Sequence, residues 1–327
     1  MIGRVAVAGF GAVAENAHLP ALREAGVEVA AVFDPSPQRR AAAAALLPRA
    51  RLHDSLAALL ARERALDALI VASPPKFHAE AALAGLRAGL HVLCEKPLTL
   101  DPEAWRELRA AADDARRCLY TVDNWAHAPA LARLIALAGS GRLGRVRRVE
   151  LEVLRTRPCA SALPDDWRKN PAISGGGILV DHGWHNLYLA CRLLGATPRL
   201  ERASLEREGG VDVAAELALR ADCGARATIR LTWKAAARAN RVLVEGDGGR
   251  AELDDDALIV DAGMERQTQR FPEKLSAGSA HPAWLAAMWP SFAAECRGEG
   301  RGRNLEEAAF CLEVIAKAYR TPETARA

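Results

Sequence analysis

The sequence predicts a two-domain α/β protein, in which a doubly wound parallel sheet is followed by an α+β region with a mainly antiparallel sheet. Three observations lead to this prediction. The first third of the chain alternates apolar strand-like runs with helical segments, an order typical of a parallel sheet. The later part shows period-two alternation between short turns that contain Gly or Asp, which is typical of antiparallel strands. The length of 327 residues also exceeds what one hydrophobic core usually serves.

The predicted strands of the first domain are short apolar runs between turn residues. They cover residues 2–8, 27–33, a short stretch near 51, 68–71, 91–94 and 119–122. Helices are expected at 38–47, from 54 onward, at 79–88, and after Asp101, where Pro102 and Glu103 suit a first helical turn. We place the boundary near Asp123, so that residues 1–123 form the first domain and 124–327 the second.

The second domain is expected to begin with a helix at 129–138 and a long strand at 146–154. A helix over about 178–194 follows Ser174 and three glycines. Period-two segments then predict strands at 214–220, 226–233, 241–245, 251–254 and 258–261. The last predicted helix, at about 305–319, lies after this meander and could pack back on the first domain.

Composition narrows the class of protein. There are 44 Lys and Arg against 41 Asp and Glu, a net charge of +3 with both signs scattered, so neither a nucleic acid nor an anionic membrane is an expected partner. No apolar run approaches the roughly 20 residues of a membrane span, and the first residues lead into a strand and not a signal peptide. The 7 cysteines have irregular spacing and no C-x-x-C pair, which predicts reduced thiols in a cytoplasmic protein without a metal.

A dinucleotide-binding turn follows the first predicted strand. The run Gly9-Phe10-Gly11-Ala12-Val13-Ala14 is a G-x-G-x-x-A motif that ends a strand and opens a helix. The first glycine permits the tight turn, the second lets the backbone approach a pyrophosphate, and the small third position allows close packing of helix and strand. The helix N-terminus adds a positive dipole for the phosphates.

The second predicted strand ends in Asp34, where a carboxylate would bind the ribose hydroxyls of NAD. A carboxylate there repels the 2′-phosphate of NADP, so we expect NAD as the cofactor. Ser36, Arg39 and Arg40 keep NADP possible, because an arginine near that site can hold the phosphate.

Lys96 ends another apolar run, between Glu95 and Pro97. It is expected at the carboxyl end of the strand at 91–94, the edge where open α/β sheets bind their ligands. Pro97 stiffens the turn, and Glu95 offers a counter-charge to the ammonium.

Asp181 and His185 stand four residues apart in the predicted helix at 178–194, so they share one helix face. Oxidation of an alcohol by hydride transfer needs a base for the hydroxyl proton, and a histidine pKa suits a reversible proton carrier. A carboxylate one turn earlier can orient the ring or relay the proton. An exposed helix pair without function is the alternative for these two residues alone.

The chain resembles the glucose–fructose oxidoreductase/inositol dehydrogenase (Gfo/Idh/MocA) family over nearly its whole length. The matching motifs are the glycine turn at 9–11, Ser73-Pro74-Pro75 with His78, the run 88–99 around Glu95-Lys96-Pro97, and the run 175–185. The resemblance implies a Rossmann domain followed by a domain with an open sheet, and a homodimer or homotetramer built through that sheet. It also implies NAD(P)-dependent hydride transfer between the nicotinamide and a secondary alcohol or ketone of a sugar, a cyclic polyol or a sugar derivative.

The resemblance assigns roles to individual residues. Lys96, Asp181 and His185 correspond to the catalytic positions. The positions expected at the cofactor are Gly9, Phe10, Gly11, Ala12, Val13, Asp34, Ser73, Pro74, His78, Glu95, Lys96 and Asn124.

Two positions depart from the family pattern. Many relatives carry a second acid where this chain has Tyr188, and an arginine where it has Ala126, so the shell that faces the substrate is altered. Indole rings stack on the C–H faces of sugars, and the substrate-binding candidates are Trp125, Trp167, Arg168 and Trp184. Core packing is the alternative reading of the tryptophans.

Two other functions remain open at this stage. One is an enzyme that keeps NAD tightly bound and uses it in a transient redox cycle, as in epimerisation or glycoside cleavage. The other is a non-catalytic dinucleotide sensor.

Overall fold

The computed structural model describes residues 2–158, 170–278 and 280–321. The chain forms two compact units. The first contains Met1–Asn124 and Ser279–Ala309, and the second contains Trp125–Gly278 and Phe310–Ala327. The chain therefore passes from one unit to the other one residue after Asp123, and a later segment returns to the first unit.

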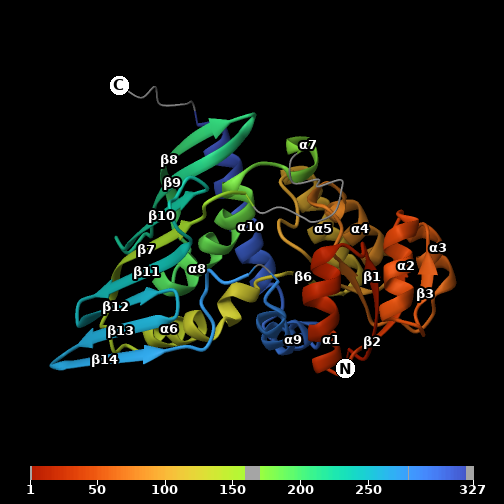
Figure 1. Cartoon of the computed structure of the whole chain (residues 1–327), viewed down its shortest axis with the longest axis horizontal. Helices are drawn as coiled ribbons and strands as arrows, with labels where there is room; N and C mark the ends of the chain where they lie inside the picture. The colour runs from red at the N-terminus through yellow and green to blue at the C-terminus, as the bar shows by residue number, and fades with distance from the viewer. Residues whose placement is uncertain (1, 159–169, 279, 322–327) are drawn as a thin grey trace. The chain divides into compact units, whose positions relative to one another are not determined.

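The first unit is built on a six-stranded parallel sheet with strand order β3-β2-β1-β4-β5-β6, which confirms the predicted doubly wound sheet (Figure 1). Its strands are β1 (Arg4–Ala8), β2 (Glu28–Phe33), β3 (Arg51–His53), β4 (Ala68–Val71), β5 (His91–Cys94) and β6 (Leu119–Thr121). The strand order reverses between β1 and β4, and in such sheets ligands bind beyond the carboxyl ends of the strands at this point.

The helices of this unit begin where the sequence supplies a cap. They are a π-helical turn (Ala14–His18) continued by α1 (Leu19–Glu24), α2 (Pro37–Leu46), α3 (Leu56–Arg62), α4 (His78–Arg87) after a 3₁₀ turn (Pro75–Phe77), and α5 (Pro102–Ala115). The side chains of Ser36, Ser55 and Asp101 accept hydrogen bonds from first-turn backbone N–H groups of α2, α3 and α5.

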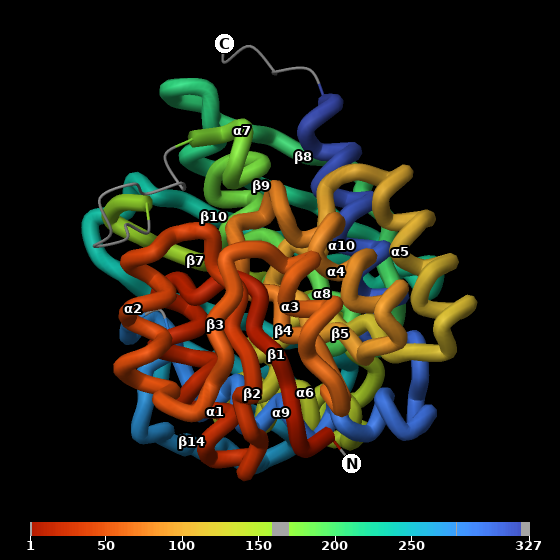
Figure 2. Tube along the Cα trace, turned by 90° about the vertical axis from the view of Figure 1, so that its right-hand side faces the viewer, coloured from red at the N-terminus to blue at the C-terminus, as the bar shows by residue number. Residues whose placement is uncertain are grey.

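Helix α9 (Pro282–Cys296) is an addition to the first unit that we did not predict from the sequence. Its apolar residues Leu285, Met288, Trp289 and Phe292 belong to the same core as the strands and α1. The ring of Phe292 lies edge-on to Tyr120 of β6, with 5.7 Å between ring centroids. The helix therefore completes one apolar face of the sheet, although it comes late in the sequence; it lies beside α1 (Figures 1 and 2).

The second unit is built on an eight-stranded sheet with strand order β14-β13-β12-β11-β7-β10-β9-β8. Its strands are β7 (Val146–Leu154), β8 (Arg199–Glu208), β9 (Val211–Arg220), β10 (Arg226–Thr232), β11 (Ala239–Gly246), β12 (Gly249–Asp254), β13 (Ala257–Ala262) and β14 (Glu265–Arg270). The sheet is mainly antiparallel as predicted, but β10 pairs parallel with β7, so it is not a simple meander. β8 and β14 were missed because they are polar edge strands; every residue of β14 is exposed.

The helices of the second unit are α6 (Pro129–Gly139), α7 (Pro171–Ser174), a π-helical turn (Leu179–Gly183) and α8 (Trp184–Leu194). Helix α8 contacts β7 and β10, and the apolar side chains of these strands are buried. Helix α10 (Arg303–Arg320) is shared, because residues up to Ala309 belong to the first unit and the rest to the second.

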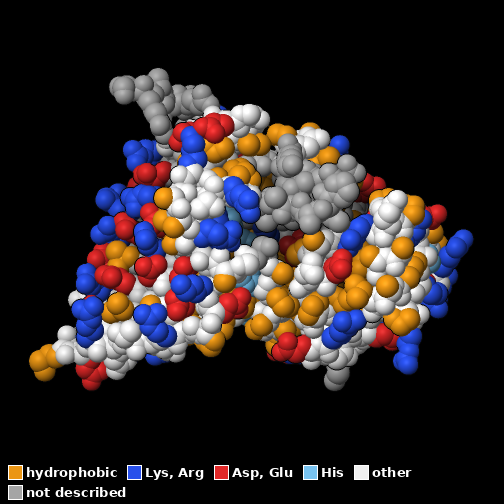
Figure 3. All heavy atoms as spheres, in the orientation of Figure 1, with side chains coloured by type: hydrophobic (Ala, Val, Ile, Leu, Met, Phe, Trp, Pro, Cys, Tyr) orange, Lys and Arg blue, Asp and Glu red, His pale blue; other side chains and the backbone are white. Residues whose placement is uncertain are grey.

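The exposed side chains of this sheet are strongly charged. Figure 3 shows basic and acidic side chains interspersed over its strands. Arg148 of β7, for example, is ion-paired with Glu150 on its own strand and with Glu245 of β11. Among the described helices, none has the length and apolar composition needed to cross a membrane.

Candidate active site

The glycine turn after β1 is fixed by a close backbone approach. Gly9 has φ of +91°, and a Cβ atom added there would lie 2.6 Å from the backbone nitrogen of Ser73. Its N–H donates to the carbonyl of Phe33 at 2.8 Å. Only glycine satisfies both the conformation and the space, so this position joins the carboxyl ends of β1, β2 and β4.

Gly11, unlike Gly9, has open space beside its Cα atom. A Cβ atom added at Gly11 would meet nothing within 4 Å, so the chain's own packing does not require a glycine there. The open space at Gly11 fits a bound group that must approach the backbone, which is the role of the second glycine in dinucleotide-binding turns. Ala12 and Val13 follow in the first turn of the helical segment, where backbone N–H groups favour phosphate.

Asp34 is held rigidly just beyond β2. It is 8% exposed, and its Oδ2 accepts a hydrogen bond of 2.7 Å from the N–H of Phe10. Its Oδ1 accepts from the N–H of Ser36 at 2.9 Å. The carboxylate is thereby tied to the glycine turn, where the ribose hydroxyls of a dinucleotide would need an acceptor.

The two arginines that kept NADP possible are engaged by the protein itself. Arg39 donates from Nε to the carbonyl of Phe10 at 2.6 Å and from Nη2 to Glu15 at 2.5 Å. Arg40 donates from Nη1 to the carbonyls of Asp34 and Pro35. Both guanidinium groups therefore lie beside the glycine turn and Asp34, held by bonds within the protein.

A carboxylate at the end of β5 is hydrogen-bonded to a buried histidine. Glu95 accepts a hydrogen bond from His18 at 2.8 Å, and its Oε2 accepts from the backbone N–H of Lys96 at 3.3 Å. Burial raises the pKa of Glu95, but the hydrogen bond and charge of His18, with the charges of Lys96 and His78, outweigh burial and leave the pKa lowered. Glu95 therefore stays ionised beside Lys96. The sequence did not identify His18 as its partner, because 77 residues separate the two.

The buried ring of His78 links the loop after β4 to the loop after β5. It is 1% exposed, and its ring nitrogens lie 2.7 Å from the carbonyls of Pro97 and Ser73. Burial lowers the pKa of its ring, against the effect of the two carbonyls. Both ring nitrogens thus contact backbone carbonyls of the protein. Pro74 precedes the 3₁₀ turn at Pro75–Phe77, and His78 follows it.

Among the buried polar atoms of the first unit that have no hydrogen-bond partner in the described part of the chain, two belong to residues that follow a strand of the parallel sheet. They are Oγ of Ser73 and Oδ1 of Asn124. Buried polar groups are rarely left unpaired, and such atoms often await a ligand or water. Both residues follow a parallel strand at its carboxyl end, which is where a dinucleotide would provide partners.

The glycine run of the second unit anchors the helix that carries Asp181 and His185. Asp212 of β9, 1% exposed, accepts hydrogen bonds from the N–H of Gly177 at 2.8 Å and of Leu179 at 2.7 Å. Tyr319 donates its hydroxyl to the same carboxylate at 2.7 Å. A Cβ atom at Gly177 would lie 1.9 Å from the carbonyl oxygen of Asp212, so this contact requires the glycine.

The helix at Asp181 is not regular, contrary to our expectation. Leu179–Gly183 form a π-helical turn, and α8 begins only at Trp184. Such turns are frequent at functional sites. Oδ2 of Asp181 lies 3.6 Å from Nε2 of His182, and the His182 ring stands edge-on to Trp125 with 5.9 Å between ring centroids, so the structure places His182 beside both residues.

His185 is held on two sides. It is 6% exposed, and its Nδ1 lies 2.9 Å from the hydroxyl of Tyr188. The Trp125 ring stacks on the imidazole at 4.9 Å with 10° between the planes. The backbone N–H of Trp125 donates to the Tyr188 hydroxyl at 3.2 Å. Tyr188 therefore positions His185, a role that the sequence signalled only as a departure from the family pattern.

The remaining substrate candidates differ in their placement. Trp184 is 2% exposed, so its side chain packs in the core, which favours the structural alternative for this residue. Trp167 and Arg168 lie outside the described residues. Lys96 belongs to the first unit and Asp181 and His185 to the second, so their approach to one another stays a prediction. No group of three or more potential metal ligands occurs among the described residues.

The fold and the glycine turn define a dinucleotide-binding protein. Residues 3–123 match the family model described as an oxidoreductase family with an NAD-binding Rossmann fold, and residues 131–252 match the GFO/IDH/MocA C-terminal domain. The chain therefore belongs to the Gfo/Idh/MocA oxidoreductase family, as the sequence motifs indicated.

Several curated proteins are similar to the chain. A D-xylose 1-dehydrogenase (NADP(+)) of Haloferax volcanii is 30% identical over 234 residues, 71% of this chain and 69% of that protein. A putative UDP-kanosamine synthase oxidoreductase subunit of Amycolatopsis mediterranei is 36% identical over 59% of this chain, and the match spans about half of that protein, 52%. A D-glucoside 3-dehydrogenase of Escherichia coli is 32% identical, with coverage of 59% and 54%.

Solved structures share the fold across both units. A 3-ketoreductase from Actinomadura kijaniata, in complex with NADP and TDP-benzene, has a TM-score of 0.80 at 24% identity over 97% of each chain. The WlbA dehydrogenase from Bordetella pertussis, in complex with NADH and UDP-GlcNAcA, has a TM-score of 0.79 at 24% identity, covering 98% of this chain and 96% of that one.

Proposed function

We propose that this protein is an NAD-dependent oxidoreductase that transfers a hydride between the nicotinamide and a secondary alcohol or ketone of a sugar, cyclic polyol or sugar derivative. The observation that carries the proposal is His185, a buried imidazole held by Tyr188 and Trp125 in a chain whose other unit carries the glycine turn and Asp34. A positioned imidazole is the group that proton exchange with a hydroxyl requires.

The residues of the first unit fit a dinucleotide. The pyrophosphate would lie over residues 9–13, where Gly11 leaves space, and the ribose hydroxyls would bind Asp34. Ser73 would donate or accept at its unpaired Oγ, and Asn124 would accept at its unpaired Oδ1. When bound, the nicotinamide supplies the hydride acceptor or donor. We expect NAD to be preferred, because the Asp34 carboxylate is fixed by two hydrogen bonds and would repel the 2′-phosphate of NADP.

His185 would exchange the substrate's hydroxyl proton. Tyr188 lies at Nδ1, so the exchange falls to Nε2. Stacking against Trp125 restricts rotation of the ring, and this keeps Nε2 in one direction during the reaction. Lys96 would hydrogen-bond the reacting oxygen, and Asp181 would orient the imidazole or relay its proton.

The names of the similar proteins support the substrate class. They include a D-xylose 1-dehydrogenase, a D-glucoside 3-dehydrogenase and an inositol 2-dehydrogenase, names that point to sugars and a cyclic polyol. These names favour net hydride transfer over the transient redox cycle and over the non-catalytic sensor.

A substrate screen tests the proposal. The purified full chain is incubated with NAD or NADP and a panel of sugars, inositols and sugar nucleotides, and reduction is followed at 340 nm. We expect reduction of NAD with at least one member, and loss of that signal in His185→Ala and in Lys96→Met. Turnover of a substrate with no net change at 340 nm and with NAD retained through gel filtration would instead establish the transient redox cycle.

We further propose a cytoplasmic homodimer or homotetramer that forms through the eight-stranded sheet. The exposed side chains on its strands carry charges of both signs, such as Arg148 and Glu150, and so offer complementary partners to a second copy. Sedimentation velocity at low and high salt tests this: a dimer or tetramer that dissociates as salt rises is expected, and a monomer at all salt concentrations contradicts it.

A further inference from the structure

Lys96 lies between two residues that are each contacted by a buried histidine. On one side, Nε2 of His18 lies 2.8 Å from Oε1 of Glu95. On the other side, Nδ1 of His78 lies 2.7 Å from the carbonyl oxygen of Pro97. Both histidines are 1% exposed. Two helical elements of the first unit therefore fix the loop of Lys96: the π-helical turn that ends at His18, and α4, which begins at His78.

The polar contact of the His18 ring is directed at Glu95. An ionised carboxylate can only accept a hydrogen bond, so Nε2 of His18 carries the proton of this bond. Nδ1 of the same ring is buried and has no hydrogen-bond partner in the part of the chain that the structure describes. A buried polar atom without a partner costs free energy, so packing alone would favour an apolar side chain here. His18 also belongs to a π-helical turn, a feature frequent at functional sites.

The bond from His18 favours the ionised form of Glu95. The side chain of Glu95 is 12% exposed, and burial alone would raise the pKa of its carboxyl group. The hydrogen bond and the charge of His18 are the largest effects that lower this pKa, followed by the charges of Lys96 and His78. The neighbouring thiol of Cys94 is buried, and burial and the charge of Glu95 raise its pKa. The negative charge beside Lys96 therefore depends mainly on His18.

Glu95 in turn restrains Lys96. Its Oε2 accepts a hydrogen bond of 3.3 Å from the backbone N–H of Lys96, and the two side chains attract one another as opposite charges. The backbone N–H of Glu95 donates to the carbonyl of Val71 at 2.9 Å, which continues the pairing of β5 with β4. The carboxylate is thus held by the sheet on one side and by His18 on the other. A fixed negative charge limits the positions that the ammonium group can take.

We propose that His18 is a positioning residue for Lys96 and acts through Glu95. The inference rests on the proposed oxidoreductase function, in which Lys96 hydrogen-bonds the reacting oxygen. His18 keeps the carboxylate ionised and in one orientation, and the carboxylate restrains the ammonium group. No proton of His18 is transferred in the reaction.

A second buried histidine–glutamate pair provides a matched control. Nε2 of His53 lies 2.8 Å from Oε1 of Glu63, and the side chains of the two residues are 6% and 0% exposed. The atoms and the distance are the same as in the pair of His18 and Glu95. His53 ends β3, however, and three strands separate β3 from β5 in the sheet. Loss of the His53 ring therefore reports the structural cost of such a pair without a contact to the loop of Lys96.

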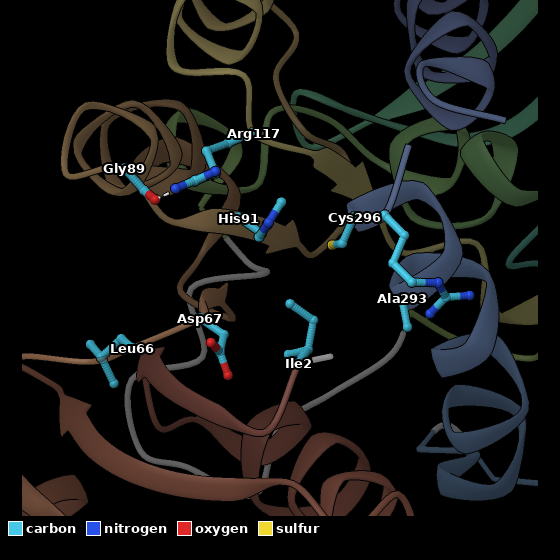
Figure 4. A pocket seen from close by; sticks show the side chains of 9 residues that line it. Ile2, Leu66, Asp67, Gly89, His91, Arg117, Ala293 and Cys296 are labelled. Atoms are coloured by element: carbon cyan, nitrogen blue, oxygen red, sulfur yellow. Dashed lines mark hydrogen bonds between the residues drawn. The ribbon is translucent and has the colours of Figure 1, made fainter. Parts of the chain in front are cut away.

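His91 provides a control on the same strand as Lys96. It begins β5, and its Nδ1 accepts a hydrogen bond of 3.0 Å from the backbone N–H of Cys118. Its ring lines a cavity of about 210 Å³ at the amino ends of the strands, together with Asp67 and Cys296 (Figure 4). The loop of Lys96 follows the carboxyl end of β5, so the His91 ring lies at the opposite end of the strand.

The test uses the full chain with NAD and a substrate found in the screen. His18→Phe should lower kcat by about 10- to 100-fold, the scale expected when a reacting group is misplaced, while the Kd for NADH changes by less than about twofold. His18→Gln should lose less, because its amide N–H can still donate to Glu95. His53→Phe and His91→Phe should keep kcat close to the wild-type value even where they lower the Tm.

Two further readouts separate positioning from general damage. Without His18, burial raises the pKa of Glu95, so the fall of kcat toward acid should begin at a higher pH in His18→Phe than in the wild type or in His53→Phe. His18→Phe should also lower kcat little further when it is added to Glu95→Gln, because residues that act as a unit are not additive.

Wild-type kcat in His18→Phe, with circular dichroism showing that this variant is folded, would overturn the inference. Equal losses of kcat in His18→Phe, His53→Phe and His91→Phe would show that His18 is only structural. A wild-type kcat and pH profile in Glu95→Gln would also overturn it, whether or not His18→Phe folds. Normal turnover of Lys96→Met would instead contradict the proposed function itself, so the two failures are distinguishable.

Discussion

Replacing Asp212 with asparagine tests how the second unit holds the helix of Asp181 and His185. The carboxylate accepts three hydrogen bonds, from Gly177, Leu179 and Tyr319. Asparagine keeps the shape of the side chain but turns one oxygen into an NH₂ group, which then faces a donor. In either orientation at least one buried donor loses its acceptor, and the remaining bonds lose their charge.

The size of the effect follows from these contacts. A hydrogen bond to a charged group contributes about 1.5–3 kcal/mol, and a buried donor without a partner costs about 1–3 kcal/mol. One bond lost and two weakened therefore predict a destabilisation of about 3 kcal/mol for Asp212→Asn. For a domain of this size, that corresponds to a fall in Tm of roughly 6–12 °C.

The assay is thermal unfolding by intrinsic fluorescence and calorimetry. Asp222→Asn is the matched control, because Asp222 has an 85% exposed side chain in a salt bridge with Arg199, and such pairs contribute only about 0–1 kcal/mol. We also expect a lower kcat in Asp212→Asn, since the π-helical turn that carries Asp181 starts at Leu179. If both variants unfold at the wild-type temperature, Asp212 does not anchor this helix.

Three further predictions follow from the same contacts. His185→Ala should lower kcat by about 10²–10⁴-fold, the usual cost of losing a positioned acid–base group. The Kd for NADH, measured by fluorescence, should stay within about twofold of the wild-type value. Normal turnover of this variant would show that His185 is structural. Asp34→Ala should reduce the ratio of kcat/KM for NAD to that for NADP, whereas a tenfold preference of the wild type for NADP would contradict our assignment. The pKa of Glu95 is lowered from 4.5, so its ionised form contributes stability that is complete above this pH and is lost as pH falls through the lowered value. The Tm of the wild type should therefore decline more steeply below pH 4.5 than the Tm of Glu95→Gln. Parallel profiles of Tm against pH would refute the pairing of Glu95 with His18.

The first unit could be predicted well because its signals are local. Short apolar runs end at turn residues, and Gly9 and Asp34 have fixed positions relative to the strands that they follow. Helix α9 could not be found in this way. Apolar residues occur on several of its faces, Pro290 lies inside it, and it packs on strands that are more than 150 residues earlier in the chain.

In the second unit, the alternation of apolar and polar residues did not predict every strand or the order of the strands in the sheet. Edge strands such as β14 have no buried face, so they carry no alternation to detect. The parallel pairing of β7 with β10 depends on which strands meet in space, and sequence order does not reveal this. Tyr188 was visible only as an unusual residue, because its hydroxyl acts through Trp125 and His185, and the partnership needs the folded arrangement.

The central claim is that Lys96 and His185, from different units, act on one substrate oxygen. The most direct measurement is a crystal structure of the chain with NAD and a substrate found in the screen. The account predicts that the reacting oxygen lies within about 3 Å of both Lys96 Nζ and His185 Nε2, with the pyrophosphate over the turn at residues 9–13. A complex with the nicotinamide beside the substrate carbon, but with His185 out of hydrogen-bond reach of that oxygen, would contradict it.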